Sequence, residues 1–378
     1  MYRKTVPKRE NFAKYHEEIA FNYHNVICAD GEPYWSEGVA YEFTLREIET
    51  VEAVTGELHS MCMETVGKIV GSGDYPEAYL LSDESKALIE SSWQKDEMHI
   101  YGRFDLQYAG GDSVKMYEYN ADTPTALLEA AVAQWQWLED TGKPDQFNSI
   151  HDKLIARWQE AKGSEVDPTL HLFASKEAQF EDWGNLEYMA DTAVQAGWNV
   201  NIDEIETLGY DSASGDFVDR TENNITHAFK LYPWEWMMTE SFAPHVRTAP
   251  TKWFEPAWKM LLSNKAILPV LWQRYPNHPN LLPAYFKEFY GYLRKPVLGR
   301  EGANIHLSNQ LIDGSHFVEE YDTGYIYQEY APLPEFDGKY PVIGSWVIGD
   351  EAAGMGIRED NTLISGNGSH FVPHYFID

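Results

Sequence analysis

The sequence predicts a mixed α/β fold, and three stretches of the chain lead to this expectation. Residues 150–250 alternate between segments with helical spacing of apolar side chains and short strand-like runs. Residues 99–120 form two alternating, aromatic-rich runs around a Gly-Gly pair, which is typical of a β-hairpin. Residues 324–365 contain further strand-like runs. With 378 residues, the chain is long enough for two or three domains.

Helices are predicted on both sides of the hairpin. Apolar residues recur with helical period over residues 44–70, and Gly71 is placed to end that helix. Residues 126–140 show the same period, with Thr123 as the candidate N-cap and Gly142 just past the end. Both patterns indicate helices that pack one apolar face on a core.

The remaining predicted elements follow in chain order. Helices are expected at Ile150–Ala161, Leu186–Ala196 and after Trp253, and strands at Leu170–Ala174, Trp198–Ile202, Gly324–Tyr330, Pro341–Ile348 and Met355–Ser365. Residues 209–223 are polar and loop-rich, and residues 292–301 indicate a short strand that runs into a glycine loop.

Acidic residues outnumber basic ones, with 60 Asp and Glu against 29 Lys and Arg and a formal charge of −31. Hydrophobic residues make up 43% and aromatic residues 14%, so this is a folding chain rather than a disordered acidic one. The charge would repel a phosphate backbone and the sequence shows no basic patch, so we expect no nucleic-acid partner. The excess acid indicates a solvated surface, and attraction of cationic small molecules is the alternative.

Other sequence features indicate a soluble cytoplasmic protein. Two cysteines are too few for a disulfide framework, and the 13 histidines lack zinc-motif spacing. The N-terminus has no apolar core of a secretory signal, and no run approaches the roughly 18 apolar residues of a membrane helix. We therefore expect no membrane partner.

The predicted hairpin carries the chemistry. Side chains alternate along a strand, so Arg103 and Asp105 share one face of the first strand, and Glu118 and Asn120 share one face of the second. A turn near residues 110–111 would place these pairs opposite each other within about one residue of register. Carboxylate and amide oxygens suit Mg²⁺, and an arginine fork suits phosphate or carboxylate. The alternative is an exposed hairpin face with cross-strand ion pairs.

Two candidate anion sites accompany the hairpin. The first is a helix start near Thr123 and Thr125, where backbone N–H groups would be exposed. The second is Lys295, on a strand that runs into a Gly-x-x-Gly loop, as in nucleotide sites outside the P-loop class. No Walker motif occurs in the sequence. Lys265 is a further candidate cation, with ordinary solvation as the alternative.

Three more charged residues each allow a structural and a functional interpretation. Arg358 follows small residues that permit close backbone approach, although a surface arginine is the default. Glu181 and Asp182 are placed as an acidic helix start, and in a cleft the same pair would hold an ammonium group.

Motifs across nearly the whole chain, in order, resemble those of one family of ligases. They are Tyr-Gly-Arg-Phe-Asp, Tyr-Glu-Tyr-Asn-Ala-Asp-Thr-Pro-Thr, Lys-Leu-Tyr-Pro-Trp-Glu-Trp, Glu-Pro-Ala-Trp-Lys, Ser-Asn-Lys-Ala-Ile-Leu-Pro, Arg-Lys-Pro-Val-Leu-Gly-Arg-Glu-Gly-Ala-Asn and Gly-Ser-Trp-Val-Ile-Gly-Asp with Gly-Ile-Arg-Glu-Asp. The chain resembles the glutathionylspermidine synthase-like ligases, and more closely their stand-alone bacterial acid–amine ligases, without the amidase domain of bifunctional members.

The resemblance implies an ATP-grasp fold with a preceding pre-ATP-grasp-like region and a permuted motif order. It implies Mg²⁺ and ATP, and the joining of small-molecule acid and amine substrates through an acyl phosphate with release of ADP and phosphate. The expected segments are 1–145 with the hairpin and its following helix, 146–250 as an α/β middle domain, and 251–378 as the nucleotide-binding part, with the ATP-grasp core shared between segments.

The resemblance also implies roles for individual residues. It implies magnesium ligands at Asp105, Glu118 and Asn120, and phosphate-side arginines at Arg103 and Arg358. It implies nucleotide contacts at Lys265, Lys295, the loop residues Gly299, Arg300, Glu301, Gly302, Ala303 and Asn304, and the adenine segment Gln328, Glu329, Tyr330 and Ala331. Substrate contacts are implied at Thr123, Thr125, Glu181 and Asp182.

The sequence departs from the family near its end. The acid that the synthases carry there, which grips the polyamine, has no clear equivalent in residues 365–370. ATP chemistry therefore transfers more directly than substrate identity. A ligase for another peptide or amino-acid pair, and a degenerate ATP-binding protein without ligase activity, are the alternative functions.

Overall fold

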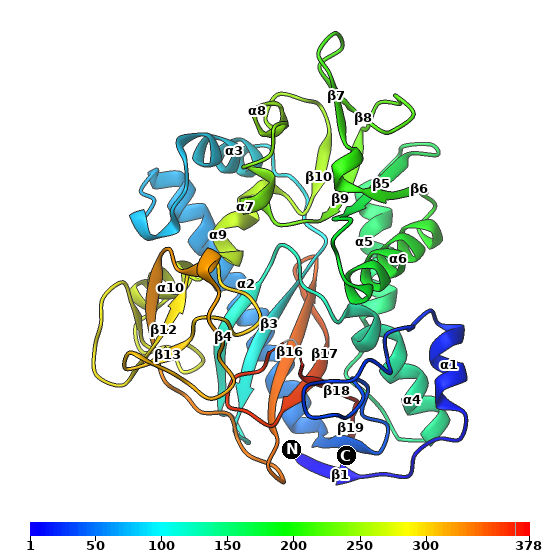
Figure 1. The fold of residues 1–378 in the computed structure, drawn as a ribbon, viewed down its shortest axis with the longest axis vertical. Coiled ribbons are helices and arrows are strands. Elements are labelled where there is room, and N and C mark those ends of the chain that lie inside the picture. Colours follow the sequence, from blue (N-terminus) through cyan, green and yellow to red (C-terminus); the bar gives the residue numbers. More distant parts are fainter. Residues whose placement is uncertain (367) are drawn as a thin grey trace.

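The computed structural model describes residues 1–366 and 368–378, so position 367 of the closing segment lies outside the described residues. It confirms a mixed α/β fold built on several sheets (Figure 1). In the part of the chain that is described, no helix is long and apolar enough to cross a membrane.

The central sheet carries the predicted hairpin. Its five antiparallel strands, in spatial order, are β18 (His370–Val372), β17 (Glu351–Asp360), β16 (Tyr340–Ile348), β3 (Tyr101–Tyr108) and β4 (Val114–Asn120). Gly110 and Gly111 both adopt positive φ in the turn between β3 and β4, a conformation that glycine reaches without steric cost. Helix α2 (Leu45–Ser72) packs across one face of the sheet, where the Thr55 hydroxyl lies 2.6 Å from that of Ser345.

A parallel sheet forms the predicted α/β middle region. Its strands, in spatial order, are β10 (Lys252–Phe254), β9 (His227–Leu231), β5 (Thr169–Ala174) and β6 (Asn199–Glu204). Helices α5 (Ile150–Lys162) and α6 (Phe180–Gln195) lie beside β5 and β6 on the right of Figure 1. Within the predicted loop region, β7 (Gly209–Asp211) and β8 (Asp216–Val218) form a small hairpin.

A third sheet holds the predicted glycine loop. Its strands, in spatial order, are β11 (Ala284–Tyr285), β15 (Tyr325–Glu329), β12 (Tyr292–Pro296), β13 (His306–Leu307) and β14 (Gln310–Leu311). The loop connects β12 to β13, and helix α10 (Ile267–Arg274) packs beside β11 and β15. This unit lies at the left of Figure 1.

The two chain ends meet in a small sheet. Strand β2 (Val39–Thr44) pairs with β1 (Tyr2–Thr5) on one side and β19 (His374–Ile377) on the other, and Figure 1 shows both termini at the bottom of the molecule. The other elements are α1 (Phe12–Glu18), α3 (Asp83–Gln94), α4 (Gln134–Thr141), α7 (Trp234–Met237), α8 (Ala243–Val246), α9 (Met260–Ser263), the 3₁₀ turns η1 (Glu77–Tyr79), η3 (Ile205–Thr207), η4 (Ala257–Lys259) and η5 (Glu319–Tyr321), and the π-helical η2 (Glu129–Ala133).

The predicted N-cap at Thr123 is wrong. The helix that leads into η2 and α4 begins at Leu127, after Ala126 adopts a positive φ of 66°. The backbone N–H of Leu127 donates to Oδ1 of Asn185 at 2.7 Å, so the cap comes from α6. The first N–H of that helix is therefore already bonded, which weakens the predicted anion site at the helix start. Gly142 ends the helix in a left-handed conformation, as predicted.

Other element boundaries differ from the prediction by a few residues. Helix α2 continues past Gly71 and ends at Gly73, which adopts the left-handed conformation of a C-cap. Helix α6 starts at Phe180 rather than at Leu186, because Gln179 and Asp182 form a reciprocal capping box. Strand β17 runs over Glu351–Asp360, so it starts and ends earlier than expected.

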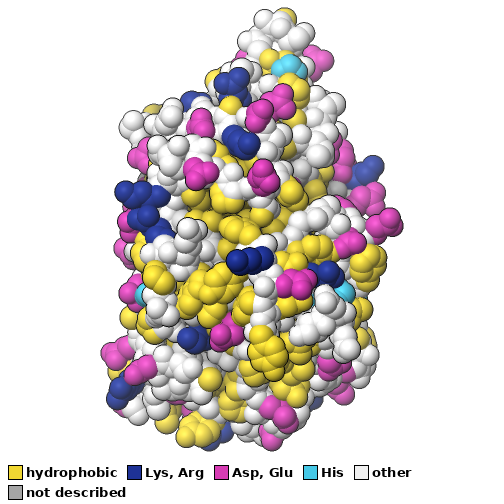
Figure 2. Space-filling view, turned by 90° about the vertical axis from the view of Figure 1, so that its left-hand side faces the viewer, with side chains coloured by type: hydrophobic (Ala, Val, Ile, Leu, Met, Phe, Trp, Pro, Cys, Tyr) yellow, Lys and Arg dark blue, Asp and Glu magenta, His cyan; other side chains and the backbone are white. Residues whose placement is uncertain are grey.

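Figure 2 shows the side of the molecule that lies at the left of Figure 1. Hydrophobic side chains gather across the middle of this face, and acidic and basic side chains are interspersed around them. The acidic excess of the sequence is therefore not concentrated on this side of the molecule.

Candidate active site

The hairpin register brings the predicted metal and phosphate residues together. Arg103 on β3 pairs with Asn120 on β4, and Asp105 pairs with Glu118. A β-bulge follows Asp105, where the pairing shifts by one residue. The prediction that Arg103 and Asp105 lie across from Glu118 and Asn120 is confirmed.

Asp105 lies between two arginines. The guanidinium of Arg103 donates to both of its carboxylate oxygens, from Nε at 2.8 Å and from Nη2 at 3.2 Å. Arg358 on β17 donates to Oδ2 at 3.0 Å. Gly344 on β16 makes room for this arrangement, because a Cβ there would lie 2.8 Å from Cδ of Arg103. The predicted arginines and one predicted metal ligand thus form a single ion-paired cluster, in which Arg103 and Asp105 are buried and Arg358 is partly exposed.

Glu118 faces two lysines. Nζ of Lys265 lies 3.1 Å from its carboxylate and donates to the carbonyl of Gly299 at 2.6 Å. Burial alone would raise the pKa of Glu118, but the charges of Lys265 and Lys295 hold it at about 2. Burial lowers the pKa of Lys295 to about 8, against the opposing effect of Glu118. Glu118 is therefore an ionised carboxylate in a positively charged pocket.

The glycine loop covers a cavity. Residues 299–303, Lys265, Lys295 and the segment Tyr330–Ala331 line this first cavity. Gln328 lies behind it and accepts a hydrogen bond from Nζ of Lys295 at 2.7 Å. Most of the predicted nucleotide residues are thus brought together around one space.

Besides Gln328, two predicted nucleotide residues do not line the first cavity. The side chain of Asn304 is buried and makes two hydrogen bonds of 2.7 Å with the backbone of Val318, which fold the loop back on itself. Glu329 is exposed on β15. Asn304 shapes the loop, and the structure offers no cavity contact for Glu329.

A second, larger cavity lies on the other side of the hairpin carboxylates. The predicted substrate residues Thr123, Thr125, Glu181 and Asp182 line it together with Asn120 and Arg103. Asp105, Glu118, Arg358 and residues 300–302 line both cavities. The two spaces therefore meet at the predicted metal ligands.

Two carboxyl groups at the acidic side of the second cavity have raised pKa values. Burial, with the neighbouring charge of Glu181, raises the pKa of Asp182 to about 6. Tyr34 also lines this cavity, and its hydroxyl donates to the buried Glu129 at 2.7 Å. Burial and the charge of Glu181 raise the pKa of Glu129 to about 8. Crowded carboxylates of this kind gain stability when a cation neutralises them.

Three charged residues that support the site escaped the sequence analysis: Asp122, Lys230 and Glu235, the last of which pairs with the predicted loop residue Arg300. Arg300 donates to Oγ1 of Thr123 at 3.2 Å and pairs with Glu235, so it links the glycine loop to the second cavity. Asp122 and Lys230 form a fully buried ion pair that holds the segment before Thr123. Glu235 and Lys230 lie in the motif Lys-Leu-Tyr-Pro-Trp-Glu-Trp, so their charges within an aromatic run were the available signal.

Comparison with known proteins identifies the family. The model of the family described as "Glutathionylspermidine synthase preATP-grasp" matches residues 3–377. The chain belongs to this family. A Haemophilus influenzae protein named "Putative acid–amine ligase" is 49% identical over an alignment of 387 positions that covers 98% of each chain.

More distant members of the family are longer than this chain. Trypanothione synthetase of Crithidia fasciculata is 29% identical over 88% of this chain, and the bifunctional glutathionylspermidine synthetase/amidase of Escherichia coli is 29% identical over 86%. This chain spans 55% and 57% of their lengths, respectively. The names of these relatives support a ligase.

A solved structure confirms the type of fold. The glutathione synthetase-like effector from Globodera pallida aligns with a TM-score of 0.58, covering 99% of this chain and 100% of its own, at 11% sequence identity. This likeness concerns the fold alone. With the family match, it confirms the predicted ATP-grasp type of fold.

Proposed function

We propose that this protein is an ATP-dependent ligase that joins a carboxylate to an amine through an acyl phosphate, with release of ADP and phosphate. The junction of the two cavities carries the proposal. A nucleotide in the first cavity and an acid in the second would meet at Asp105, Glu118 and Arg358. That is the geometry a phosphoryl transfer between two bound molecules needs.

The nucleotide side of the junction fits Mg²⁺ and ATP. Two carboxylates and one amide, from Asp105, Glu118 and Asn120, are hard oxygen donors in cross-strand register. Lys265 and Lys295 would neutralise phosphate oxygens beneath the glycine loop. When bound, Mg-ATP would supply the phosphoryl group that activates the acid.

The chain's own residues would do the positioning. Arg103 is held by Asp105 on one side and donates to the carbonyl of Thr125 at 2.7 Å on the other, so its guanidinium is fixed before substrate arrives. Its low exposure of 7% strengthens its electrostatic effect on an anion in the cavity. Arg358 adds a second positive charge at the same carboxylate. Together they would hold the acid and the charge that develops on it.

The acidic residues of the second cavity support an amine as the other substrate. Glu181 and Asp182 lie next to each other on α6 and line the cavity beside Thr123 and Thr125. Burial, and after it the repulsion from Glu181, raises the pKa of Asp182, and an ammonium group there would relieve that repulsion. By analogy with the named relatives, we propose a peptide such as glutathione as the acid and a polyamine-like molecule as the amine.

A panel assay tests the ligase proposal. ADP release is measured with Mg-ATP across pairs of acids and amines, for the wild type and for Asp105→Ala and Glu118→Ala. Substrate-stimulated ADP release in the wild type, lost in both variants, is expected. Asp112→Ala, on the exposed hairpin turn, is the matched control and should retain activity. If no pair stimulates ADP release, the ATP-binding protein without ligase activity is the better description.

A second assay tests the amine site. We expect Glu181→Gln to raise the KM for the amine more than the KM for ATP, because the lost charge faces the second cavity. Glu187→Gln on an exposed position of the same helix is the control and should leave both constants unchanged. Equal increases in the two constants for Glu181→Gln would refute the assignment.

A further inference from the structure

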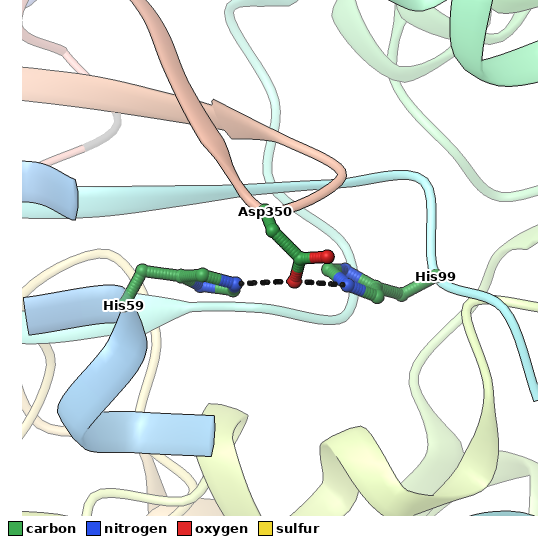
Figure 3. A group of neighbouring side chains, drawn as sticks. All are labelled: His59, His99 and Asp350. Atoms are coloured by element: carbon green, nitrogen blue, oxygen red, sulfur yellow. Dashed lines mark hydrogen bonds and ion pairs between the residues drawn. The ribbon is translucent and has the colours of Figure 1, made fainter. Parts of the chain in front are cut away.

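A second cluster of ligand-type side chains lies away from the cavities. His59 on α2, His99 just before β3 and Asp350 in the turn between β16 and β17 point toward one another (Figure 3). Their ligand atoms all lie within 4.8 Å of one another. Arg358 is at the other end of β17, about 25 Å along the strand at roughly 3.3 Å per residue. None of the three residues lines either cavity, although His99 precedes Arg103 by four residues and Tyr119, which contacts His59, is next to Glu118 in the chain.

Two of the three separations within the cluster are close to those between ligands of one ion. Nε2 of His59 lies 3.2 Å from Oδ1 of Asp350, and Nε2 of His99 lies 3.3 Å from the same oxygen. Both contacts are hydrogen bonds, and both are longer than the roughly 2.7–2.9 Å of charge-assisted ones. Ligands at 2.0–2.1 Å in a tetrahedral arrangement are separated by about 3.3 Å.

The imidazoles are held ready for coordination. Both rings are buried, with His59 at 1% and His99 at 5% exposure. Nδ1 of His59 lies 3.0 Å from the hydroxyl of Tyr119, which orients the ring as outer-sphere partners of metal-bound histidines do. Burial lowers the pKa of both rings, which favours the neutral form that binds metals. Nδ1 of His99 is buried without a hydrogen-bond partner among the described residues.

We propose that His59, His99 and Asp350 form a binding site for a divalent transition-metal ion of the zinc class. Two nitrogens and one carboxylate oxygen favour such an ion over Mg²⁺ or Ca²⁺, which prefer oxygen ligands alone. The side chain of Asp350 is 71% exposed, so solvent has access for ion entry and for a fourth ligand. The ion would tie together α2, the start of β3 and the β16–β17 turn.

Zinc binding to the full chain tests the site. Zn²⁺ alone is titrated by competition with Co²⁺, whose visible absorption reports tetrahedral coordination, in a Cys28→Ser background that removes the partly exposed thiol. We expect one equivalent to bind and to raise the Tm. Asp350→Ala removes an exposed ligand without disturbing the core, and should weaken binding by more than the roughly 10- to 100-fold that loss of an outer-sphere partner costs. Tyr119→Phe should weaken binding within that range.

A histidine outside the cluster provides the control. His151 contacts the hydroxyl of Tyr188 at 2.9 Å, as His59 contacts Tyr119, so His151→Gln should leave zinc binding unchanged. If the parent chain binds no equivalent of zinc, or if Asp350→Ala binds it as tightly, the three residues are only a hydrogen-bonded clamp and the proposal is overturned. None of these outcomes depends on ligase activity.

Discussion

If Lys295 contacts the nucleotide as proposed, the affinity for ATP should depend on pH. Its ammonium is buried on β12 and donates to Gln328. Burial lowers its pKa from 10.5 to about 8, a cost of roughly 3 kcal/mol against charging, although Glu118 favours the charged form and Lys265 opposes it. The charged form prevails below pH 8 and is lost as the pH rises.

The magnitude follows from the charged fraction. If the nucleotide binds the ammonium form, the apparent Kd is the intrinsic Kd divided by the fraction of Lys295 that is charged. About nine lysines in ten are charged at pH 7 and about one in ten at pH 9, given a pKa of about 8. The apparent Kd for Mg-ATP should therefore rise about tenfold between these pH values.

Calorimetric titration of Mg-ATP without acid or amine measures this change. Lys295→Arg keeps its charge throughout the range, so its apparent Kd should be nearly independent of pH even if its affinity is lower. Lys287→Arg, on an exposed position, is the control and should retain the tenfold rise. A change below twofold in the wild type, or a tenfold rise in Lys295→Arg, would refute the reasoning.

Three further predictions concern buried groups. Lys230→Met should lower the free energy of unfolding by about 3–5 kcal/mol, because it leaves the buried carboxylate of Asp122 without its partner. Urea denaturation measures this loss, and the double variant with Asp122→Asn should recover stability. A loss below 1 kcal/mol would contradict the prediction. The pKa of Glu129, raised by burial to about 8, means that the folded chain keeps a proton that the unfolded chain releases near pH 4.5, so stability should fall as the pH rises between these values; Glu129→Gln should flatten that slope in denaturation curves, and an unchanged slope would count against the assignment. Asn185→Ala should cost about 1 kcal/mol by removing the cap on Leu127, whereas no loss in urea denaturation would show that another group caps the helix.

Much of the site was predictable because its residues are close in sequence. Alternation along a strand and a Gly-Gly turn specify which side chains of a hairpin share a face, so Asp105 and Glu118 could be placed opposite each other from the sequence alone. The glycine loop after Lys295 was predictable for the same reason. The roles proposed for these residues came from resemblance to a family, since spacing alone left an exposed hairpin face equally open.

The sequence by itself determined the fold class, the hairpin register to within about one residue, and the loop, because periodicity and turn chemistry act over a few residues. Only the tertiary structure decided which distant groups meet. Leu127 is capped by Asn185 from another helix, so the N-cap predicted at Thr123 from the local pattern was wrong. Three separate segments bring together His59, His99 and Asp350, so no local zinc-motif spacing marks them in the sequence. Long-range packing sets such contacts, and no short pattern in the chain encodes it.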